Sequence, residues 1–369
     1  MHKFAIGTSS QPLAEPPIYW GNRTKNRNGH NMKFRAVLCL LLSVSAGFIL
    51  LPTPAHATFP GKNGRIVFVQ DGQIFTINPD GSDVKQLTHL GPDNSANWPA
   101  WSADGKQIVF NEFPPPDGKA EIWLMDADGG HQRRVLAERY FDENRPSLSP
   151  DGSKVVFGRC KRLVGDGDTC AIHTVNLDGS GLTRIVPYHF DDSQRSPMFS
   201  PDGRTIAFII SPDVSHGFQG VTYLVNADGT NLRRITPPAP CLIRPDWSPD
   251  GSRLTLFAHL CNPQNETIAV MNADGYDLRY LTNNGSDFYS NPHDRNPAWS
   301  PQGDFIVFER DAPDYSSSDI YLIRPDGSEA KAIARVTHAK RAPSPPSRAP
   351  KPRKIEDGGS IPRWGVAVE

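Results

Sequence analysis

Two tetrapeptide motifs recur along most of the chain at a spacing of about fifty residues. The first reads SADG at 102, SPDG at 149, 200 and 248, and SPQG at 300, and a degenerate copy reads GKNG at 61. The second reads NPDG at 78, DADG at 126, NLDG at 176, NADG at 226 and 272, and RPDG at 324. The aspartates at its third position step by 48, 50, 50, 46 and 52 residues. Six copies of one unit therefore fill residues 61–336, which predicts a repeat architecture.

Both motifs have the chemistry of a type I turn. Proline at the second position fixes φ, and glycine at the fourth accepts the left-handed conformation that follows. The stretches beside the turns are β-branched or aromatic and of strand length, as in KQIVF at 106–110 and EIWLM at 121–125. Glycine (31) and proline (35) make up nearly a fifth of the 369 residues. This composition suits short strands joined by many turns and argues against long helices.

A third signature, proline followed two places later by a large apolar residue, precedes the first turn in five repeats. It occurs in NWPAW (97–101), NRPSL (144–148), RSPMF (195–199), IRPDW (243–247) and RNPAW (295–299). Each unit thus reads as a four-stranded antiparallel meander that begins with this signature and ends in a basic strand such as RRVL (133–136). Basic side chains protect a terminal strand from edge-to-edge pairing, so the last strand should lie outermost and the first should line the centre.

Six equal meanders, none of which can bury both of its faces alone, pack radially as a six-bladed β-propeller. The alternative, a β-sandwich, would not need the same turn at the same place in every repeat. The repeated sequence WSADGKQIVF…EIWLMDADG resembles the repeat of the TolB-type propellers, relatives of the WD40 repeats. The resemblance covers residues 58–336 and the last few residues. It implies an all-β fold of four-stranded blades.

What the resemblance implies about activity is broad. Propellers of this family serve as periplasmic binding proteins, as domains appended to peptidases and as enzyme scaffolds. The chain lacks the smaller α/β domain that precedes the propeller in TolB. The resemblance therefore implies a fold more than a place in that protein's envelope complex.

Residues 1–57 are expected to lie outside the fold. A basic head at 32–35, an apolar run at 36–51 and the small-x-small sequence AHA at 55–57 are typical of a secretory signal peptide at 32–57. A retained membrane anchor is the alternative, but the apolar run is shorter than the roughly 20 residues that span a bilayer. Residues 1–31 read as sequence upstream of the true start. We expect an exported mature protein, periplasmic or secreted, without a transmembrane span.

Export would bring four cysteines, Cys160, Cys170, Cys241 and Cys261, into an oxidising compartment, where an even number favours disulfides. Four cysteines allow three pairings. The simplest joins Cys160 to Cys170 across one loop and Cys241 to Cys261 at the same end of two neighbouring strands. A zinc site is the alternative, although no Cys-x-x-Cys spacing supports it.

The topology divides the molecule into a face of short turns and a face of long, dissimilar loops, and binding residues concentrate on such loops. Residues just before the strand prolines should ring the channel mouth on the loop face. Their mixture of guanidinium, amide and carboxylate groups suits a carboxylate-bearing or peptide ligand. Alternatively, these charges pair with one another and hold the blades together. The candidates are Asn97, Glu143, Asn144, Arg145, Arg195, Arg244, Asp294, Arg295 and Asn296.

Catalytic motifs are scarce. The chain has no Gly-x-Ser-x-Gly elbow and no phosphate-binding loop, and we expect no cofactor. His89, His189, His216, His259 and His293 fall on the loop face, where several could hold a metal, with His189 and His293 as the candidates; exposed or packed histidines are the alternative. His131 belongs to the turn face and should be inert.

Charge separates the parts of the chain. The chain has 39 basic and 40 acidic residues. Residues 1–57 contain 6 basic and 1 acidic residue, and residues 337–369 contain 7 basic and 3 acidic residues. The propeller therefore retains 26 basic and 36 acidic residues. This acidic balance argues against nucleic acid or an anionic membrane as a partner. Residues 337–359 are rich in proline and arginine and should form a flexible loop, either a plain solvated linker or a segment that touches acidic surfaces.

The last ten residues, 360–369, are predicted to close the ring. The first repeat opens at GKNGRIVFV and supplies a second, third and fourth strand but no first. In IPRWGVAV, Pro362 and Trp364 stand as in RNPAW, and Gly365 stands where a turn would begin. A chance proline-x-tryptophan in a disordered tail is the alternative.

Two functional hypotheses follow. The preferred one is a monomeric exported scaffold that binds a peptide, an envelope or extracellular protein segment or another carboxylate-bearing ligand on its loop face. The second is a metal-assisted lyase or hydrolase that acts on acidic saccharides at the channel mouth, because the histidines lie on the same face.

Overall fold

The computed structural model describes the chain in ten stretches, and all statements below concern these residues. They are 60–116, 118–136, 140–163, 167–187, 192–212, 220–236, 241–259, 266–283, 291–337 and 362–367. The predicted signal peptide and nearly all of the predicted loop at 337–359 lie outside the described residues. Within the described stretches no helix is long and apolar enough to cross a membrane.

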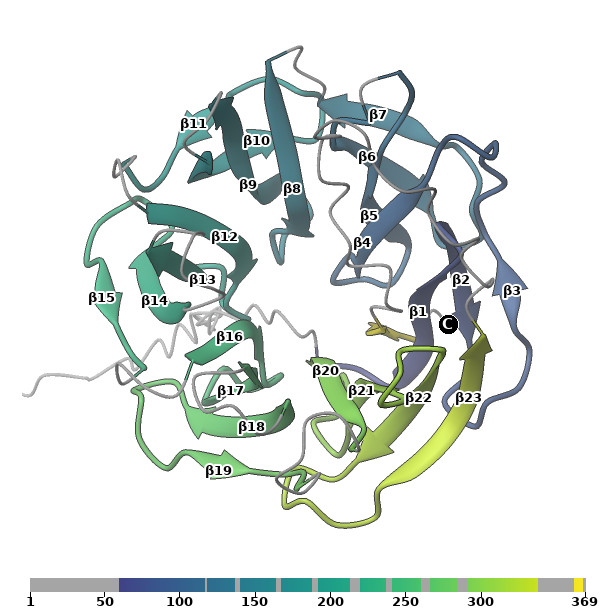
Figure 1. Ribbon diagram of the computed structural model, residues 1–369. Helices are drawn as coiled ribbons and strands as arrows, with labels where there is room; N and C mark the ends of the chain where they lie inside the picture. Colours follow the sequence, from purple (N-terminus) through teal and green to yellow (C-terminus); the bar gives the residue numbers. More distant parts are fainter. Residues whose placement is uncertain are drawn as a thin grey trace, which may run out of the picture. The chain divides into compact units, whose positions relative to one another are not determined.

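Twenty-four strands form six four-stranded antiparallel sheets, which stand around a central axis as blades (Figure 1). The innermost strands are β4 (Ala96–Trp101), β8 (Phe141–Leu148), β12 (Asp192–Phe199), β16 (Cys241–Trp247), β20 (His293–Trp299) and β24 (Arg363–Val366). The second strands are β1 (Asn63–Gln70), β5 (Gln107–Glu112), β9 (Lys154–Leu163), β13 (Thr205–Pro212), β17 (Arg253–His259) and β21 (Ile306–Asp311).

The third strands are β2 (Gln73–Ile77), β6 (Glu121–Asp126), β10 (Gly167–Asn176), β14 (Val221–Asn226), β18 (Thr267–Asn272) and β22 (Ser317–Ile323). The outer strands are β3 (Lys85–Gln86), β7 (Arg133–Leu136), β11 (Thr183–Arg184), β15 (Arg233–Arg234), β19 (Arg279–Tyr280) and β23 (Lys331–Thr337). We number the blades from the amino terminus, so that blade 1 contains β24, β1, β2 and β3 and blade 6 contains β20 to β23. The predicted six-bladed propeller is confirmed.

The first turn motif folds as its sequence predicts. In SADG, the N–H of Gly105 donates to the carbonyl of Ser102 at 3.0 Å, and Gly105 has a φ of 68°. The hydroxyl of Ser102 donates to Asp104 at 2.7 Å and accepts the N–H of Gln107 at 2.9 Å. The same serine-to-aspartate contact recurs at Ser149, Ser200 and Ser248. In blades 2 to 6 the inner strand is thereby joined to the second strand by a hydrogen-bonded turn.

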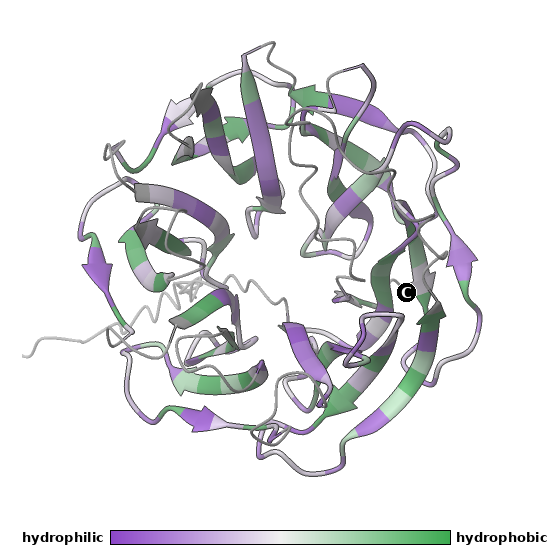
Figure 2. Cartoon of the chain, viewed as in Figure 1, coloured by the Kyte–Doolittle hydropathy of each residue, from purple (hydrophilic) through white to green (hydrophobic). Residues whose placement is uncertain are grey.

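The hydrophobic core lies between neighbouring blades. Six buried clusters correspond to the six blade boundaries; one unites Val109 and Ile122 of blade 2 with Val155 of blade 3, and another unites Ile66 of blade 1 with Val307 of blade 6. The short outer strands β3, β15 and β19 are hydrophilic, whereas the middle strands are largely apolar (Figure 2). A single blade could bury neither face alone, so closure of the ring completes the core.

The carboxyl-terminal strand closes the ring, as predicted. β24 pairs antiparallel with β1, with Trp364 opposite Ile66 and Arg363 opposite Val67. The Trp364 side chain belongs to the cluster between blades 1 and 6, and its indole N–H donates to the carbonyl of Gly64 at 3.0 Å. The first and last parts of the propeller sequence thus form one sheet.

Candidate functional site

Each internal inner strand carries a β-bulge at the residue before its proline. The pairing register shifts there, for example between Asn97 and Ala100 in β4 and between Arg295 and Ala298 in β20. The pre-proline residues all adopt a φ near +54°, although a residue before proline disfavours the helical regions and a non-glycine residue seldom has positive φ. They are Trp98 (52°), Arg145 (55°), Ser196 (53°), Arg244 (55°) and Asn296 (53°). The bulge turns these five side chains toward the central axis.

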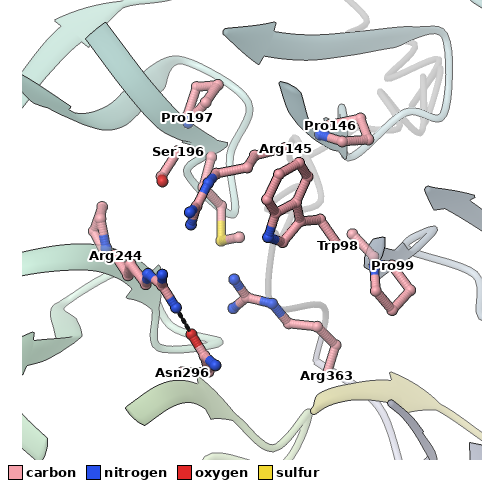
Figure 3. Close-up of a pocket in the computed structure, with 12 residues that line it drawn as sticks. Trp98, Pro99, Arg145, Pro146, Ser196, Pro197, Arg244, Asn296 and Arg363 are labelled. Atoms are coloured by element: carbon pink, nitrogen blue, oxygen red, sulfur yellow. Dashed lines mark hydrogen bonds between the residues drawn. The ribbon is translucent and has the colours of Figure 1, made fainter. Parts of the chain in front are cut away.

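These five residues line a pocket at the channel mouth, together with Arg363 of β24. Each blade thus contributes one of the six. The pocket encloses about 40 Å³ and has no acidic residue among its lining side chains. Figure 3 shows the guanidinium groups of Arg145, Arg244 and Arg363 directed into one space, with the indole nitrogen of Trp98 beside them. Inner strands begin at the long connections, so the pocket lies toward the loop-rich face.

Neighbouring side chains hold the pocket residues in place. The ring of Phe113 packs edge-on against Trp98 with centroids 5.6 Å apart, and the Arg145 guanidinium lies 4.8 Å from the Trp98 ring centroid. Trp98 is only 7% exposed, and among the described residues its indole N–H has no hydrogen-bond acceptor. Arg244 donates to the side-chain oxygen of Asn296. The pocket therefore combines fixed cations with a buried donor that is aimed into it.

A second section of the channel adjoins this mouth and shares some of its lining residues. It is lined by the residues that follow the prolines, including Ala100, Ser147, Met198 and Asp246. Arg363 lines both sections, and its guanidinium lies 3.2 Å from the carboxylate of Asp246 in β16 of blade 5. Among the described lining residues, the single acid is thus paired with the cation from blade 1.

Buried charges behind the mouth position Asn296. Its amide nitrogen donates to Glu309 at 2.9 Å, and the Glu309 side chain is fully buried. Burial, reinforced by the nearby carboxylate of Asp311, raises the pKa of Glu309 well above its usual value. Burial therefore favours the protonated form of Glu309, which would stabilise Asn296 without adding negative charge to the channel wall.

Arg310 and Arg295 of blade 6 form ion pairs within the blade and with Glu266 of blade 5. Arg310 contacts both carboxylate oxygens of Asp294, at 2.6 and 2.8 Å. Arg295 lies 2.5 Å from Glu266 and 3.4 Å from Asp311. These pairs bridge strands and blades, which is what the alternative interpretation of the charged residues predicts.

The structure divides the predicted mouth residues into two groups. Arg145, Arg244 and Asn296 line the pocket. Glu143 and Asp294 are not at the mouth, because both are 0% exposed within the blades. The other predicted residues, Asn97, Asn144, Arg195 and Arg295, are half-buried and do not line the pocket.

The bulge explains this division, because it brings only the residue directly before each proline to the axis. Sequence reasoning missed Trp98, Ser196 and Arg363. Trp98 and Ser196 could have been predicted from the sequence, because each stands directly before the proline of its strand. Arg363 lies between Pro362 and Trp364 and reaches the mouth from a different position in the motif.

Cys160 and Cys170 are opposite one another on β9 and β10 and form a disulfide, the pairing expected from the sequence. Cys261 and the side chain of Cys241 lie outside the described residues, so the second pairing stays a prediction.

Among the histidines, His189 and His216 also lie outside the described residues, as does the side chain of His259. His89 is exposed. His131 is exposed too, and its ring lies 2.7 Å from the Asp126 carboxylate on the turn face, which raises the pKa of the imidazole.

His293 is buried in the wall of blade 6. Its ring stacks on Tyr315 with centroids 4.6 Å apart and lies 3.4 Å from Glu266. Burial lowers its pKa. Within the described stretches no group of three or more His, Cys, Asp or Glu side chains is arranged to hold a metal ion. The metal-dependent hypothesis stays a prediction, because His189 is not described.

Comparison with known proteins agrees with this architecture. The sequence profile described as "TolB beta propeller domain" matches residues 99–347. The chain is 24% identical over 268 residues to the Tol-Pal system protein TolB of Francisella tularensis subsp. tularensis, a match that covers 70% of this chain and 55% of the relative. The chain thus spans about half the length of the curated relatives it matches.

Solved structures show the same fold. TolB from Acinetobacter baumannii superposes with a TM-score of 0.61 at 19% identity, over 82% of this chain and 67% of that one. A putative TolB from Agrobacterium tumefaciens gives a TM-score of 0.56 at 18% identity, over 75% of this chain and 90% of that one. The family match covers more than half of the sequence and agrees with the six-bladed ring. The chain therefore belongs to the TolB beta propeller domain family.

Proposed function

We propose that this protein is an exported binding scaffold whose channel mouth holds a carboxylate-bearing segment of a peptide or protein. The observation that carries the proposal is the convergence of three guanidinium groups and one buried indole N–H in a pocket to which all six blades contribute. Guanidinium groups bind carboxylates with paired, charge-assisted hydrogen bonds. An indole N–H is a donor only, so the residues of the mouth favour a ligand that accepts.

The charge of the whole propeller makes this local arrangement significant. The propeller sequence has an acidic excess, with 36 acidic against 26 basic residues, yet the lining of the mouth is basic. A concave site lined by one sign of charge concentrates ligands of the opposite sign. The mouth therefore favours an anionic segment, while the acidic body disfavours nucleic acid.

The enclosed space at the mouth is small, about 40 Å³. It suits a single carboxylate group at the end of a peptide or on a side chain. The long connections around the mouth would supply the remaining contacts and the specificity. The strained backbone at the five bulges supports the same location, because conformations of this kind cluster at functional sites.

The compartment and the class of partner are part of this proposal. The leader-like sequence at 32–57 favours export, and the disulfide between Cys160 and Cys170 suits an oxidising compartment. The similar proteins are named for the Tol-Pal system. By analogy we place the partner of this chain among envelope or extracellular proteins.

Calorimetric titration with two peptides tests the proposal. One is the acidic tetrapeptide AEEE, and the control is AQQQ with an amidated carboxyl terminus, which carries no carboxylate. We expect AEEE to bind and the neutral peptide not to bind. The variant with Arg145→Gln, Arg244→Gln and Arg363→Gln should bind AEEE at least tenfold more weakly. Its matched control removes three exposed arginines from outer strands by Arg233→Gln, Arg279→Gln and Arg335→Gln, and should bind like the wild type.

A second variant guards against misfolding of the first. Trp98→Phe keeps an aromatic ring at this position and removes the indole N–H together with part of the indole ring. A hydrogen bond to a charged group contributes about 1.5–3 kcal/mol, so AEEE affinity should fall at least tenfold while the circular dichroism spectrum stays that of the folded wild type. Equal affinity in Trp98→Phe, in both triple variants and in the wild type would refute a ligand site at the mouth.

A further inference from the structure

The strand that completes the mouth differs from the other inner strands in how it is attached. β24 has four residues, whereas the five internal inner strands have six to eight. Between β23, which ends at Thr337, and β24, which begins at Arg363, lie 25 residues of sequence. The other inner strands follow their preceding outer strands after 4 to 12 residues. β24 is therefore the inner strand with the shortest pairing and the longest connection.

The contacts of β24 reach four blades. Its backbone pairs with β1 in blade 1, and Ala367 just beyond it donates to the carbonyl of Lys62 at 2.9 Å. Trp364 fills the boundary between blades 1 and 6. Gly365 lies against the indole of Trp101 in blade 2, so closely that an added Cβ would be 2.7 Å from that ring. β24 thus contacts blades 1, 2 and 6 along its short length.

The contact with blade 5 is made through the ligand site itself. The Arg363 side chain extends across the channel to Asp246, whose carboxylate is only 5% exposed and also accepts the N–H of Trp299 at 2.8 Å. With β24 seated, the channel lining contains three arginines and one acid that is paired with a cation. Without β24, two arginines would remain and Asp246 would lose Arg363. An anion should therefore bind more tightly when β24 is seated.

We propose that occupancy of the channel mouth by an anionic ligand and seating of β24 in blade 1 are coupled, so that the carboxyl-terminal strand is a ligand-dependent clasp of the ring. This proposal rests on the proposed function, because it needs an anion at the mouth. Coupling of this kind is reciprocal. If seating of β24 increases the affinity for the ligand by some factor, bound ligand increases the equilibrium constant for seating of β24 by the same factor. Release of β24 would in turn disassemble one side of the site.

Hydrogen–deuterium exchange on the full chain, with and without AEEE at saturation, tests the clasp. The amides of residues 363–367 report the seating of β24, and those of β18 in blade 5 report general stability. We expect exchange at 363–367 to slow at least tenfold when AEEE is bound, with little change in β18. Local opening would then be the process that the ligand suppresses.

Two variants connect this effect to Arg363. Arg363→Gln leaves Trp364, Gly365 and the backbone pairing of β24 in place, so the ring should still close, but bound AEEE should slow exchange at 363–367 less than threefold. Arg363→Lys keeps the charge and should retain part of the effect. The control Arg335→Gln, on the exposed edge of β23, should behave like the wild type.

The possible outcomes separate this inference from the function on which it rests. If AEEE binds and exchange at 363–367 does not change, the clasp is wrong and the binding scaffold stands. If exchange slows equally in β18 and at 363–367, the ligand stabilises the whole ring and the clasp is again wrong. If AEEE does not bind the wild type at millimolar concentration, both proposals fall.

Discussion

At the scale of single residues, the propeller depends on positions where the backbone has a positive φ. The glycines that close the second turn motif have φ values between 83° and 98°. Each also lies against a carbonyl of the neighbouring blade's outer strand region; Gly229 faces Ile185, and Gly129 faces Leu87. These glycines therefore serve both the turn and the contact between blades. In the first motif, an added Cβ at Gly152 would meet nothing within 4 Å, and at Gly203 or Gly251 it would meet only a proline side chain at 3.4 Å.

Gly229→Ala should destabilise the protein more than Gly152→Ala. An alanine at Gly152, with φ of 67° and nothing within 4 Å of an added Cβ, should cost about 1–2 kcal/mol for the left-handed conformation. At Gly229 the new Cβ would also lie 2.8 Å from the carbonyl oxygen of Ile185, so the loss should be at least twice as large. Urea unfolding of both variants measures the difference, and equal losses would show that the blade contact is unimportant.

Glu309 should make stability depend on pH. Burial raises the pKa of the Glu309 carboxyl in the folded state above its value in the unfolded state. The folded state therefore binds this proton more tightly. Its contribution to the free energy of unfolding is complete below the unfolded-state pKa and is lost as the pH rises through the folded-state pKa. Glu309→Gln, which can still accept from Asn296, removes this loss. Relative to that variant, the wild type should lose up to about 1.4 kcal/mol per pH unit above pH ~4.5.

Denaturant unfolding from pH 4.5 to 8 measures this difference. Glu329→Gln on an exposed turn provides the control and should follow the wild type at every pH. A stability difference between wild type and Glu309→Gln that is constant over this range would mean that Glu309 titrates alike in the folded and unfolded states.

At the scale of elements, one short strand controls the closure of the ring. β24 supplies a large buried aromatic side chain, a cation of the mouth and the inner edge of blade 1. Without it, β1 would present an unpaired edge to the channel. The outer strands, by contrast, are short in five blades and rich in exposed basic side chains, which suits a surface that must avoid pairing.

Trp364→Ala should lower the free energy of unfolding by about 3–5 kcal/mol, as removal of a buried large aromatic usually does. Deletion of residues 360–369 should cost at least as much, because it also removes the pairing with β1. Shortening the connection by removing residues 342–354 should cost little, since it leaves the contacts of β24 intact. Thermal unfolding compares the three variants; an unchanged melting temperature after the deletion would be incompatible with closure by β24.

At the scale of the whole molecule, stability comes from blade boundaries, and these form a closed circle. Each of the six boundaries has its own buried cluster. In an open stack of repeats, the end units lack one neighbour and can unfold first. A closed ring has no end unit, so loss of one blade removes two boundaries at once.

We therefore expect the ring to unfold in one cooperative transition. Six of the seven tryptophans lie in blades 1, 2, 5 and 6, at 98, 101, 123, 247, 299 and 364, and blades 3 and 4 have none. Tryptophan fluorescence thus reports four blades, while far-ultraviolet circular dichroism reports all six. The two midpoints in urea should coincide. Separate midpoints would show that blades 3 and 4 unfold on their own.

The sequence by itself determined the elements and their number. Turn chemistry and alternating apolar runs are local properties, and a motif repeated every fifty residues marks every hairpin in the same way. The vacancy in blade 1 was also visible, because the first repeat lacks the proline signature that the last ten residues supply. The six-bladed ring and its closing strand could therefore be predicted without coordinates.

Only the tertiary structure decided which side chains meet at the axis. A strand assigned from sequence is treated as a regular pleat, in which residues alternate between two faces. The bulge before each proline adds a residue and rotates the strand, so that Arg145 and Arg244 reach the mouth while Glu143 and Asp294 are buried in the blades. The pairing of Arg363 with Asp246 joins residues 117 positions apart, and only closure of the ring brings them together.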